Sequence, residues 1–175
     1  MGGKTGINFR EAKNLIGTFY QPSLVLIDTH FLKSLPKEEL ISGFGEVIKY
    51  SYLTHDKLYS KLLSDWNLLA KKEINFLEKI IYECVKIKSA VVSKDEFEIS
   101  GLRKILNLGH TFAHAFESYS NYTLSHGKAV IAGIISALSL SLEMGLMSEK
   151  QFNYILELPL KFKSSIRLNN INEKE

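Results

Sequence analysis

The sequence contains a single cysteine and three prolines, and it has no apolar stretch long enough to span a membrane. The lone cysteine, Cys84, excludes a disulfide framework and is typical of a reducing compartment, so we expect a cytoplasmic protein with Cys84 as an unreactive core residue. The longest apolar stretch, residues 129–142, is interrupted by Gly133 and by serines. It falls short of the ~20 residues that a membrane span needs. No charged segment followed by an apolar one opens the chain, so we also expect no signal peptide and no membrane partner.

The sequence also lacks a tract of one charge. Its 22 basic and 19 acidic residues are interspersed and give a formal net charge of +3, which argues against nucleic acid as a partner. With 45% hydrophobic residues, the composition is that of a globular domain and excludes a disordered or repetitive chain. A chain of this length buries roughly 70% of the surface that its unfolded form exposes, so it can form a core without disulfides.

The residue pattern divides the chain into a short first part, residues 1–35, and a helical part, residues 36–175. The first part is rich in glycine, and its apolar, β-branched run at residues 24–27 predicts a short strand. Pro36, with two acidic residues close behind it, predicts the start of the first helix. Proline is tolerated in a first helical turn, and negative charge is favourable there.

Beyond Pro36, apolar residues recur three and four positions apart, which predicts amphipathic helices. The expected helices span residues 37–53, 56–70, 72–93 and 127–144, with a further segment at residues 103–119 that we expect to pack beside the last of them. We expect residues 129–142 to be core. The tail from Leu156, which contains Pro159 and ends in a polar run, is expected to fray. The predicted fold class is therefore mainly α, with one or more short strands near the N-terminus.

Three of the five histidines cluster, at positions 110, 114 and 126. His110 and His114 stand four residues apart, so on a helix their rings share one face and could reach one metal ion, and His126 begins the next helix. Zinc-like ions accept imidazole together with carboxylate, and the sequence offers many carboxylates. Spacing alone does not decide which histidines bind a metal, and histidines packed in a core or on a helix surface are the alternative.

The glycine-rich segment at residues 2–6 is similar to a phosphate-binding loop only superficially. The full pattern GxxxxGK[ST] is absent and no strand precedes it, so a nucleoside-triphosphatase is rejected. Lys4 in this segment can still present an ammonium group to an anion such as phosphate, and a frayed N-terminus is the alternative. Further cations that only the fold could bring together are Lys13, Lys49, Lys88 and Arg103.

Several motifs follow one another along the chain: GGKTGIN, KNLIGTFYQP, FLKSLPKEELISGFGEVIKY, LRKILNLGHTFAHAFE and SHGKAV. Together, from about residue 2 to about residue 145, the chain resembles the 3-dehydroquinate synthase family. The resemblance implies the multi-helix C-terminal domain of the dehydroquinate synthase-like fold. Residues 1–35 would be a glycine-rich segment at the edge between domains, and residues 36–175 the metal- and substrate-binding domain. Because the family is about twice as long and begins with an NAD-binding α/β domain, we expect a fragment, truncated at both ends and inactive alone.

The activity that the resemblance implies is that of a phosphate-eliminating lyase of the shikimate pathway, which leads to chorismate and the aromatic amino acids. The family converts a sugar acid phosphate, 3-deoxy-D-arabino-heptulosonate 7-phosphate, into 3-dehydroquinate. It uses NAD+, bound mostly by the N-terminal domain, and a divalent zinc or cobalt ion. For the full-length enzyme the resemblance implies a homodimer.

Site residues follow from the resemblance position by position. The implied metal ligands are Glu46, His110 and His126. The implied catalytic residues are Lys4 and Lys49, near the reacting end of the substrate, and His114, which would face the substrate phosphate. The implied substrate-binding residues are Asn14, Lys88, Arg103, Asn107 and Glu98. The implied neighbours of NAD are Lys4, Lys13, Phe31, Leu32, Lys33 and Ser34.

Two departures from the family pattern bear on this site. The segment DEFEISGLR has one residue more than usual, which is expected to displace Glu98 relative to Arg103. Lys128 stands where the family usually has glutamate, and we expect its side chain to point outward.

Two alternatives stay open: another sugar-phosphate cyclase on the same scaffold, and a non-catalytic helical binding module with structural histidines. Lys88 and Arg103 favour the shikimate substrate over another cyclase substrate, since they would have no purpose without a substrate carboxylate, and the binding module predicts no stoichiometric metal.

Overall fold

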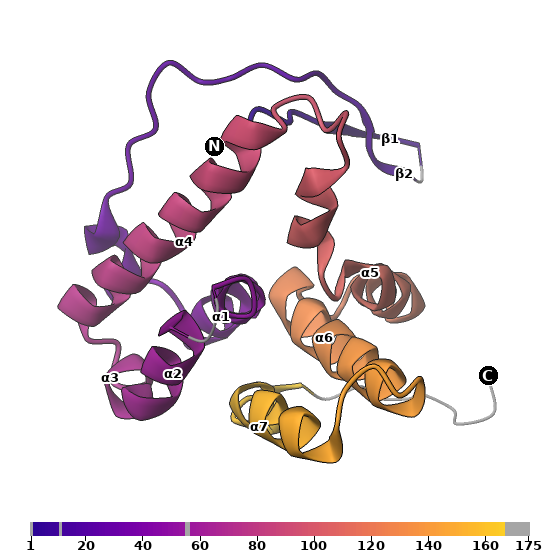
Figure 1. Ribbon diagram of the computed structural model, residues 1–175. Helices are drawn as coiled ribbons and strands as arrows, with labels where there is room; N and C mark the ends of the chain where they lie inside the picture. The colour runs from indigo at the N-terminus through magenta and orange to yellow at the C-terminus, as the bar shows by residue number, and fades with distance from the viewer. Residues whose placement is uncertain (1, 11, 55–56, 167–175) are drawn as a thin grey trace.

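An N-terminal hairpin and a set of helices make up the fold (Figure 1). The computed structural model describes residues 2–10, 12–54 and 57–166, without the side chains of residues 8, 12–14 and 70. The strands are β1 (Ile7–Phe9) and β2 (Ala12–Ile16). The α-helices are α1 (Lys37–Ser51), α2 (Lys57–Ser64), α3 (Trp66–Ala70), α4 (Ile74–Lys94), α5 (His110–Tyr119), α6 (His126–Glu143) and α7 (Glu149–Leu160). Short 3-10 helices are η1 (Thr29–Lys33), η2 (Leu102–Asn107) and η3 (Lys163–Ser165). The mainly helical fold class predicted from the sequence is confirmed.

Helix α6 is the centre of the helical part and packs against α1, α5 and α7 (Figure 1). Ala129, Val130, Ile131 and Ile134 on α6 are fully buried. Burial of each large aliphatic side chain contributes about 1.5–3 kcal/mol to folding, so α6 anchors the core. The expectation that this apolar stretch is core is confirmed for its first half, while Leu140 further along is exposed.

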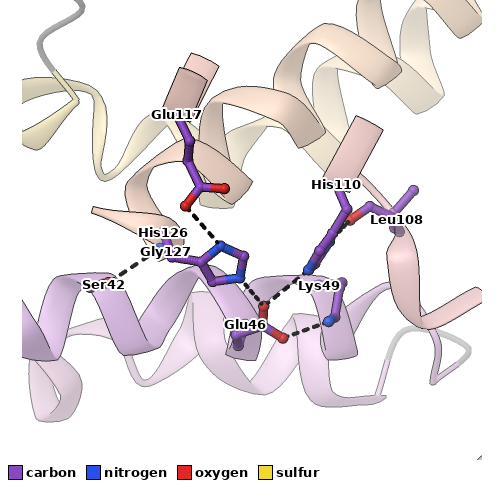
Figure 2. A network of polar contacts seen from close by, with 8 residues as sticks. All are labelled: Ser42, Glu46, Lys49, Leu108, His110, Glu117, His126 and Gly127. Atoms are coloured by element: carbon purple, nitrogen blue, oxygen red, sulfur yellow. Dashed lines mark hydrogen bonds and ion pairs between the residues drawn. The ribbon is translucent and has the colours of Figure 1, made fainter. Parts of the chain in front are cut away.

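Two glycines let α1 and α6 approach each other closely. A side chain at Gly127 of α6 would overlap the carbonyl oxygen of Ser42 on α1, and one at Gly45 would overlap the backbone of Gly127. Only glycine leaves room for backbones at this separation. The contact brings Glu46, the residue after Gly45, next to the first residue of α6, His126 (Figure 2).

Helix α4 packs against α1, η1 and η2. It lies within one residue or two of its predicted position, and its first half buries Phe76, Leu77 and Ile80. Helix α1 likewise begins directly after Pro36, as predicted, and ends two residues early at Ser51. The periodic apolar pattern therefore located these long helices correctly, because each buries one continuous face.

The strand predicted at residues 24–27 is wrong. The described strands are β1 and β2, an antiparallel pair that joins Ile7 to Ile16. Residues 24–27 are extended, but no described strand pairs with them, and Leu24 and Leu26 are 80% and 87% exposed. A β-propensity run becomes a strand only when a neighbouring strand accepts its hydrogen bonds. In Figure 1 this part of the chain forms an extended arm between the hairpin and η1.

The helix predicted over residues 56–70 is two helices, α2 and α3, and Asp56 lies outside the described residues. The break falls at Asp65, and just before it Ser64 Oγ donates a hydrogen bond to the backbone carbonyl oxygen of Lys61 at 3.1 Å. Local side-chain bonds of this kind compete with helical backbone geometry. No helix among the described residues has the length and apolar character needed to cross a membrane.

The expectation that the tail frays from Leu156 onward is wrong for its first part. Helix α7 continues to Leu160 and includes Pro159, and Leu158 and Phe162 are buried. The Phe162 ring packs edge-on against Trp66, with 5.0 Å between ring centroids. Burial of Leu158 and Phe162 outweighs the destabilising effect of Pro159 inside the helix. The polar run at the end, residues 169–175, lies outside the described part of the structure.

Candidate metal centre and cationic cleft

A cleft of about 830 Å³ opens between the N-terminal arm, α1, α4, η2 and the first turns of α5 and α6. Ten of the site residues predicted from the sequence line it: Lys4, Glu46, Lys49, Lys88, Glu98, Arg103, Asn107, His110, His114 and His126. Residues that the sequence did not single out complete the wall, among them Val25 and Ile27 of the arm. The fold thus gathers groups that lie up to 122 positions apart, from Lys4 to His126, into one cavity.

Glu46, His110 and His126 form a group in which one possible ligand atom from each residue lies within 4.8 Å of the others. Glu46 Oε1 lies 3.2 Å from His126 Nε2 and 3.5 Å from His110 Nε2 (Figure 2). Each residue comes from a different helix, α1, α5 and α6 respectively. Two imidazole nitrogens and one carboxylate oxygen are a donor set that zinc and cobalt accept, and a catalytic site of this type leaves a position open for water or substrate.

The backbone before α5 places His110 in this group. Gly109 has a φ of +77°, and a side chain there would lie 2.7 Å from Ile134 Cγ1 on α6. A glycine in this left-handed conformation allows the chain to turn directly against α6 and to begin α5 at His110. The glycine directly before the start of α5 therefore has a packing reason.

In both histidine rings the second nitrogen, Nδ1, also has a partner. His110 Nδ1 lies 3.2 Å from the carbonyl oxygen of Leu108, and His126 Nδ1 lies 3.4 Å from Glu117 Oε1 (Figure 2). Partners of this kind keep Nδ1 protonated and leave Nε2 free to bind a metal. The residues present therefore fit a divalent ion. Sequence reasoning missed Glu117, although its position seven residues after His110 places it on the same helix face.

His114 lies beside this group but is not part of it. Its ring meets the His110 ring edge-on, with 5.6 Å between centroids, and it is exposed in the cleft. Among the described residues, the ligand group contains His110 and His126 without His114. The geometry therefore favours the set that the family resemblance implied, and the role of these residues as metal ligands stays a prediction.

The charges around Glu46 favour its ionised form. Burial alone would raise the pKa of the Glu46 carboxyl, but hydrogen bonds to His110 and His126 and the nearby Lys49 ammonium hold it well below its usual range. Lys49 Nζ lies 2.5 Å from Glu46 Oε2, and Lys49 is only 3% exposed. The hydrogen bond to Glu46, together with the Glu117 charge, raises the pKa of His126. Glu46 is thus kept as an anion, the form that binds a metal.

Arg103 and Lys88 provide further positive charge in the lining of the cleft. Arg103 is 4% exposed; its Nη1 donates to the carbonyl oxygen of Glu96 at 2.6 Å and its Nη2 to that of Gly2 at 3.0 Å. A Cβ atom added at Gly2 would lie 3.3 Å from both Arg103 Nη2 and Lys88 Cε, so the two cationic side chains lie on the same part of the backbone. Burial, together with the charges of Lys49, Arg103 and Lys4, lowers the pKa of Lys88.

Lys4 and Glu98 form an ion pair across the cleft mouth. Glu98 has a positive φ of +60°, an unusual conformation for a glutamate, and its side chain remains in the cleft lining despite the additional residue in this segment. The four cations of the lining, Lys4, Lys49, Lys88 and Arg103, outnumber its two carboxylates. The cleft therefore favours an anionic ligand.

Some predicted residues lie elsewhere. Phe31, Leu32, Lys33 and Ser34 belong to η1 or its end and are not among the cleft-lining residues. Lys13 and Asn14 stand in β2, and their side chains lie outside the described part of the structure.

Two single-residue expectations also have an outcome. Lys128 does not point outward, because its side chain is 17% exposed and pairs with Glu38 in the first turn of α1. Cys84 packs against the core and also lines the cleft, and burial raises the pKa of its thiol to about 12. A thiol with so high a pKa is unreactive, as expected.

Solved structures with a similar fold identify the class. A 2-epi-5-epi-valiolone synthase from Streptomyces hygroscopicus subsp. jinggangensis 5008, with NAD+ and Zn2+ bound, aligns with a TM-score of 0.82 and 27% identity over 95% of this chain and 47% of that chain. A 2-deoxy-scyllo-inosose synthase complexed with carbaglucose-6-phosphate, NAD+ and Co2+ aligns with a TM-score of 0.80 and 28% identity, over 99% of this chain and 47% of that chain. The fold thus defines a helical domain of the sugar-phosphate cyclase fold, and the cleft contains a candidate metal site.

Sequence comparison identifies the family. Residues 43–175 match the family described as 3-dehydroquinate synthase C-terminal, and residues 1–42 match 3-dehydroquinate synthase N-terminal. The chain belongs to the 3-dehydroquinate synthase family. The boundary between the two matches falls inside α1, whereas the division at residues 35 and 36 stays a prediction.

Curated relatives carry the same name. A 3-dehydroquinate synthase of Pelagibacter ubique (strain HTCC1062) is 43% identical over 98% of this chain and 49% of its own length. One of Campylobacter fetus subsp. fetus (strain 82-40) is 47% identical over 93% of this chain and 46% of its own length. The chain spans about half the length of the curated relatives it matches.

Proposed function

We propose that the chain is the metal- and substrate-binding half of a 3-dehydroquinate synthase, a lyase that converts 3-deoxy-D-arabino-heptulosonate 7-phosphate into 3-dehydroquinate and phosphate. The observation that carries this proposal is the convergence of Glu46, His110 and His126 with four cations in one cleft. An anionic sugar acid phosphate matches the charge of that cleft. Because the chain spans half the length of its relatives, we propose that it binds metal and substrate but does not complete the reaction alone.

Glu46, His110 and His126 would hold a zinc or cobalt ion, as their donor set fits either metal. When bound, this ion supplies Lewis-acid polarisation of substrate oxygens, and NAD+ supplies a hydride acceptor and donor. Lys4, Lys13 and residues 31–34 would border NAD+, most of whose binding surface would come from outside this chain. The whole enzyme is proposed to be a cytoplasmic homodimer.

The remaining cleft residues would orient the substrate. Lys88 and Arg103 would attract the substrate carboxylate, and Glu98 would fix the position of Lys4 through their ion pair. His114 and Asn107, with Asn14, would bind the phosphate, while Lys4 and Lys49 would face the reacting end. Arg103 Nη2 donates one N–H to the Gly2 carbonyl, which leaves its second N–H to donate to a substrate carboxylate.

Another sugar-phosphate cyclase is the second candidate, since the solved structures of similar fold are cyclases with other names. Lys88 and Arg103 favour the sugar acid, because a substrate without a carboxylate gives two clustered, partly buried cations no counter-ion. Turnover assays with the full-length enzyme on both kinds of substrate separate the two candidates. Activity restricted to a substrate without a carboxylate would overturn the first.

The metal site is tested by the zinc and cobalt content of the purified chain, alongside His126→Ala and His114→Ala variants handled identically. We expect near one ion per wild-type chain. His126→Ala removes a ligand and should lose the ion, whereas His114→Ala, the matched control on the adjacent helix, should keep it.

Two outcomes would contradict this assignment. A wild-type chain without metal after reconstitution would show that these residues do not form the proposed site and would favour a non-catalytic binding module. Loss of metal in His114→Ala with retention in His126→Ala would show that the ligand set is wrong. Circular dichroism of each metal-free variant checks that the helices are intact.

A further inference from the structure

Glu117 is a buried carboxylate in the last turns of α5, outside the group of residues that line the cleft. It is 5% exposed, and its Oε1 lies 3.4 Å from His126 Nδ1. Burial of a carboxylate is costly unless donors are directed at it. In Figure 2 the Glu117 side chain extends from α5 to the His126 ring, which lies between Glu117 and Glu46.

We infer that Glu117 is a positioning residue for the metal centre, acting through His126. This inference rests on the proposed metal site. With its Oε1 facing His126 Nδ1, Glu117 accepts a hydrogen bond from the Nδ1–H group, which selects the tautomer whose Nε2 carries the lone pair. That nitrogen is the one directed at Glu46 Oε1, 3.2 Å away. Without the carboxylate, the ring could rotate or adopt the other tautomer.

The two candidate histidine ligands differ in the partner of their Nδ1 atom. His110 Nδ1 faces a neutral backbone carbonyl, that of Leu108, whereas His126 Nδ1 faces a carboxylate. A carboxylate partner raises the basicity of the ligating nitrogen more than a carbonyl does, because negative charge stabilises the positive charge that the ring acquires on binding a metal. The His110 side chain is largely buried, and this burial helps to fix its ring. The His126 side chain is exposed, so packing alone does not fix its ring. Glu117 therefore supplies the orientation that His126 lacks.

The placement of Glu117 follows from helix geometry. Position 117 is seven residues after His110, nearly two helical turns, so both side chains lie on one face of α5. That face packs against α6, which begins at His126. One helix thus provides a ligand at its first residue and the partner of a second ligand two turns later.

The test compares Glu117→Gln with wild type for zinc affinity, by competition with a chelator, and for the visible absorption spectrum of the Co2+-loaded chain. Glutamine keeps the size of the side chain but removes its charge. We expect zinc affinity to fall about 10–100-fold and the Co2+ bands to shift. Glu38→Gln is the matched control, since Glu38 contacts Lys128, two residues after His126, and no ligand.

Thermal unfolding of the metal-free chains distinguishes positioning from a structural role. Reduced affinity with unchanged metal-free stability supports the inference. Unchanged affinity in Glu117→Gln, or an equal loss in Glu38→Gln, overturns it while leaving the metal site intact. Absence of metal in the wild type overturns the proposed function itself.

A measurement on the wild-type chain covers the case in which Glu117→Gln does not fold. In the zinc-loaded chain, nuclear magnetic resonance should show an exchange-protected Nδ1 proton on His126, hydrogen-bonded to a carboxylate. A rapidly exchanging Nδ1 proton, or Nδ1 bound to zinc, would overturn the inference.

Discussion

Asp95 shows how one side chain fixes part of the cleft wall. Its Oδ1 accepts the backbone N–H of Ser100 at 3.0 Å, and its Oδ2 accepts that of Arg103 at 3.1 Å. Burial alone would raise the pKa of Asp95, but these backbone donors overcome that effect and hold the pKa below its usual range. The ionised form of Asp95 therefore holds the loop that presents Arg103 to the cleft.

This arrangement predicts a pH dependence. Because the folded pKa is lowered, Asp95 stabilises the fold above its unfolded pKa of about 3.9, and the contribution is lost as pH falls through the folded value. Asp95→Asn should unfold at lower urea concentration than wild type near neutral pH, and the difference should shrink in acid. Urea unfolding of both chains across this pH range provides the measurement. A difference that stays constant into acid would show that the charge of Asp95 does not hold the loop.

At the scale of elements, the contact between α1 and α6 positions two of the three candidate ligands. A methyl group at Gly127 would overlap the backbone of Ser42, so Gly127→Ala must push the helices apart. Overpacking of this kind costs about 1–3 kcal/mol of unfolding free energy. We expect Gly127→Ala to lower the free energy of unfolding by at least about 1 kcal/mol. We also expect it to weaken zinc binding, because Glu46 and His126 would move apart. Denaturant unfolding and zinc competition measure the two effects.

Gly43 is the matched control for this prediction. It lies on α1 two residues before Gly45, and a side chain there would have nothing within 4 Å. Replacing a glycine in an exposed helix interior by alanine stabilises by roughly 0.5–1 kcal/mol. Gly43→Ala should therefore raise stability slightly and keep zinc binding. Equal zinc affinities in Gly127→Ala and Gly43→Ala would show that the close helix contact does not position the ligands.

Long helices could be predicted from the sequence, while the N-terminal segment could not. Helices α1, α4 and α6 each bury a periodic apolar face, a signal that is local in the chain. The strand expected at residues 24–27 depends on a partner strand, which local pattern does not reveal. The hairpin of β1 and β2 and the break at Asp65 were missed for the same reason, since pairing and side-chain bonds decide them.

For the candidate site, too, the sequence predicts some features and not others. Family motifs predicted ten residues that the fold does gather in one cleft, although their roles stay predictions. The contacts between them were beyond sequence reasoning. Arg103 bonds to the Gly2 carbonyl, 101 positions away, and Lys4 pairs with Glu98. Glu117 gave only a weak signal, its spacing from His110, because a carboxylate that contacts a histidine ring carries no motif of its own.

At the scale of the whole molecule, the arm between the hairpin and η1 presents a run of exposed apolar side chains. All four side chains of residues 24–27 are exposed; Val25 and Ile27 also line the cleft, whereas Leu24 and Leu26 do not and are the more exposed pair. No described strand pairs with these residues. An extended, apolar segment with unpaired backbone groups is a template for association with another chain.

We therefore expect the purified chain to self-associate in a concentration-dependent way, and Leu24→Lys combined with Leu26→Lys to reduce this association. Charge on the exposed side blocks edge pairing and reduces the apolar surface, and it leaves Val25 and Ile27 in the cleft wall. Sedimentation velocity over a range of concentrations measures the effect. Leu140→Lys combined with Leu146→Lys, at exposed positions on and after α6, is the control. If the control abolished association and the arm variant did not, the chain would associate through the exposed surface near α6. The arm would then be stable in water without a partner.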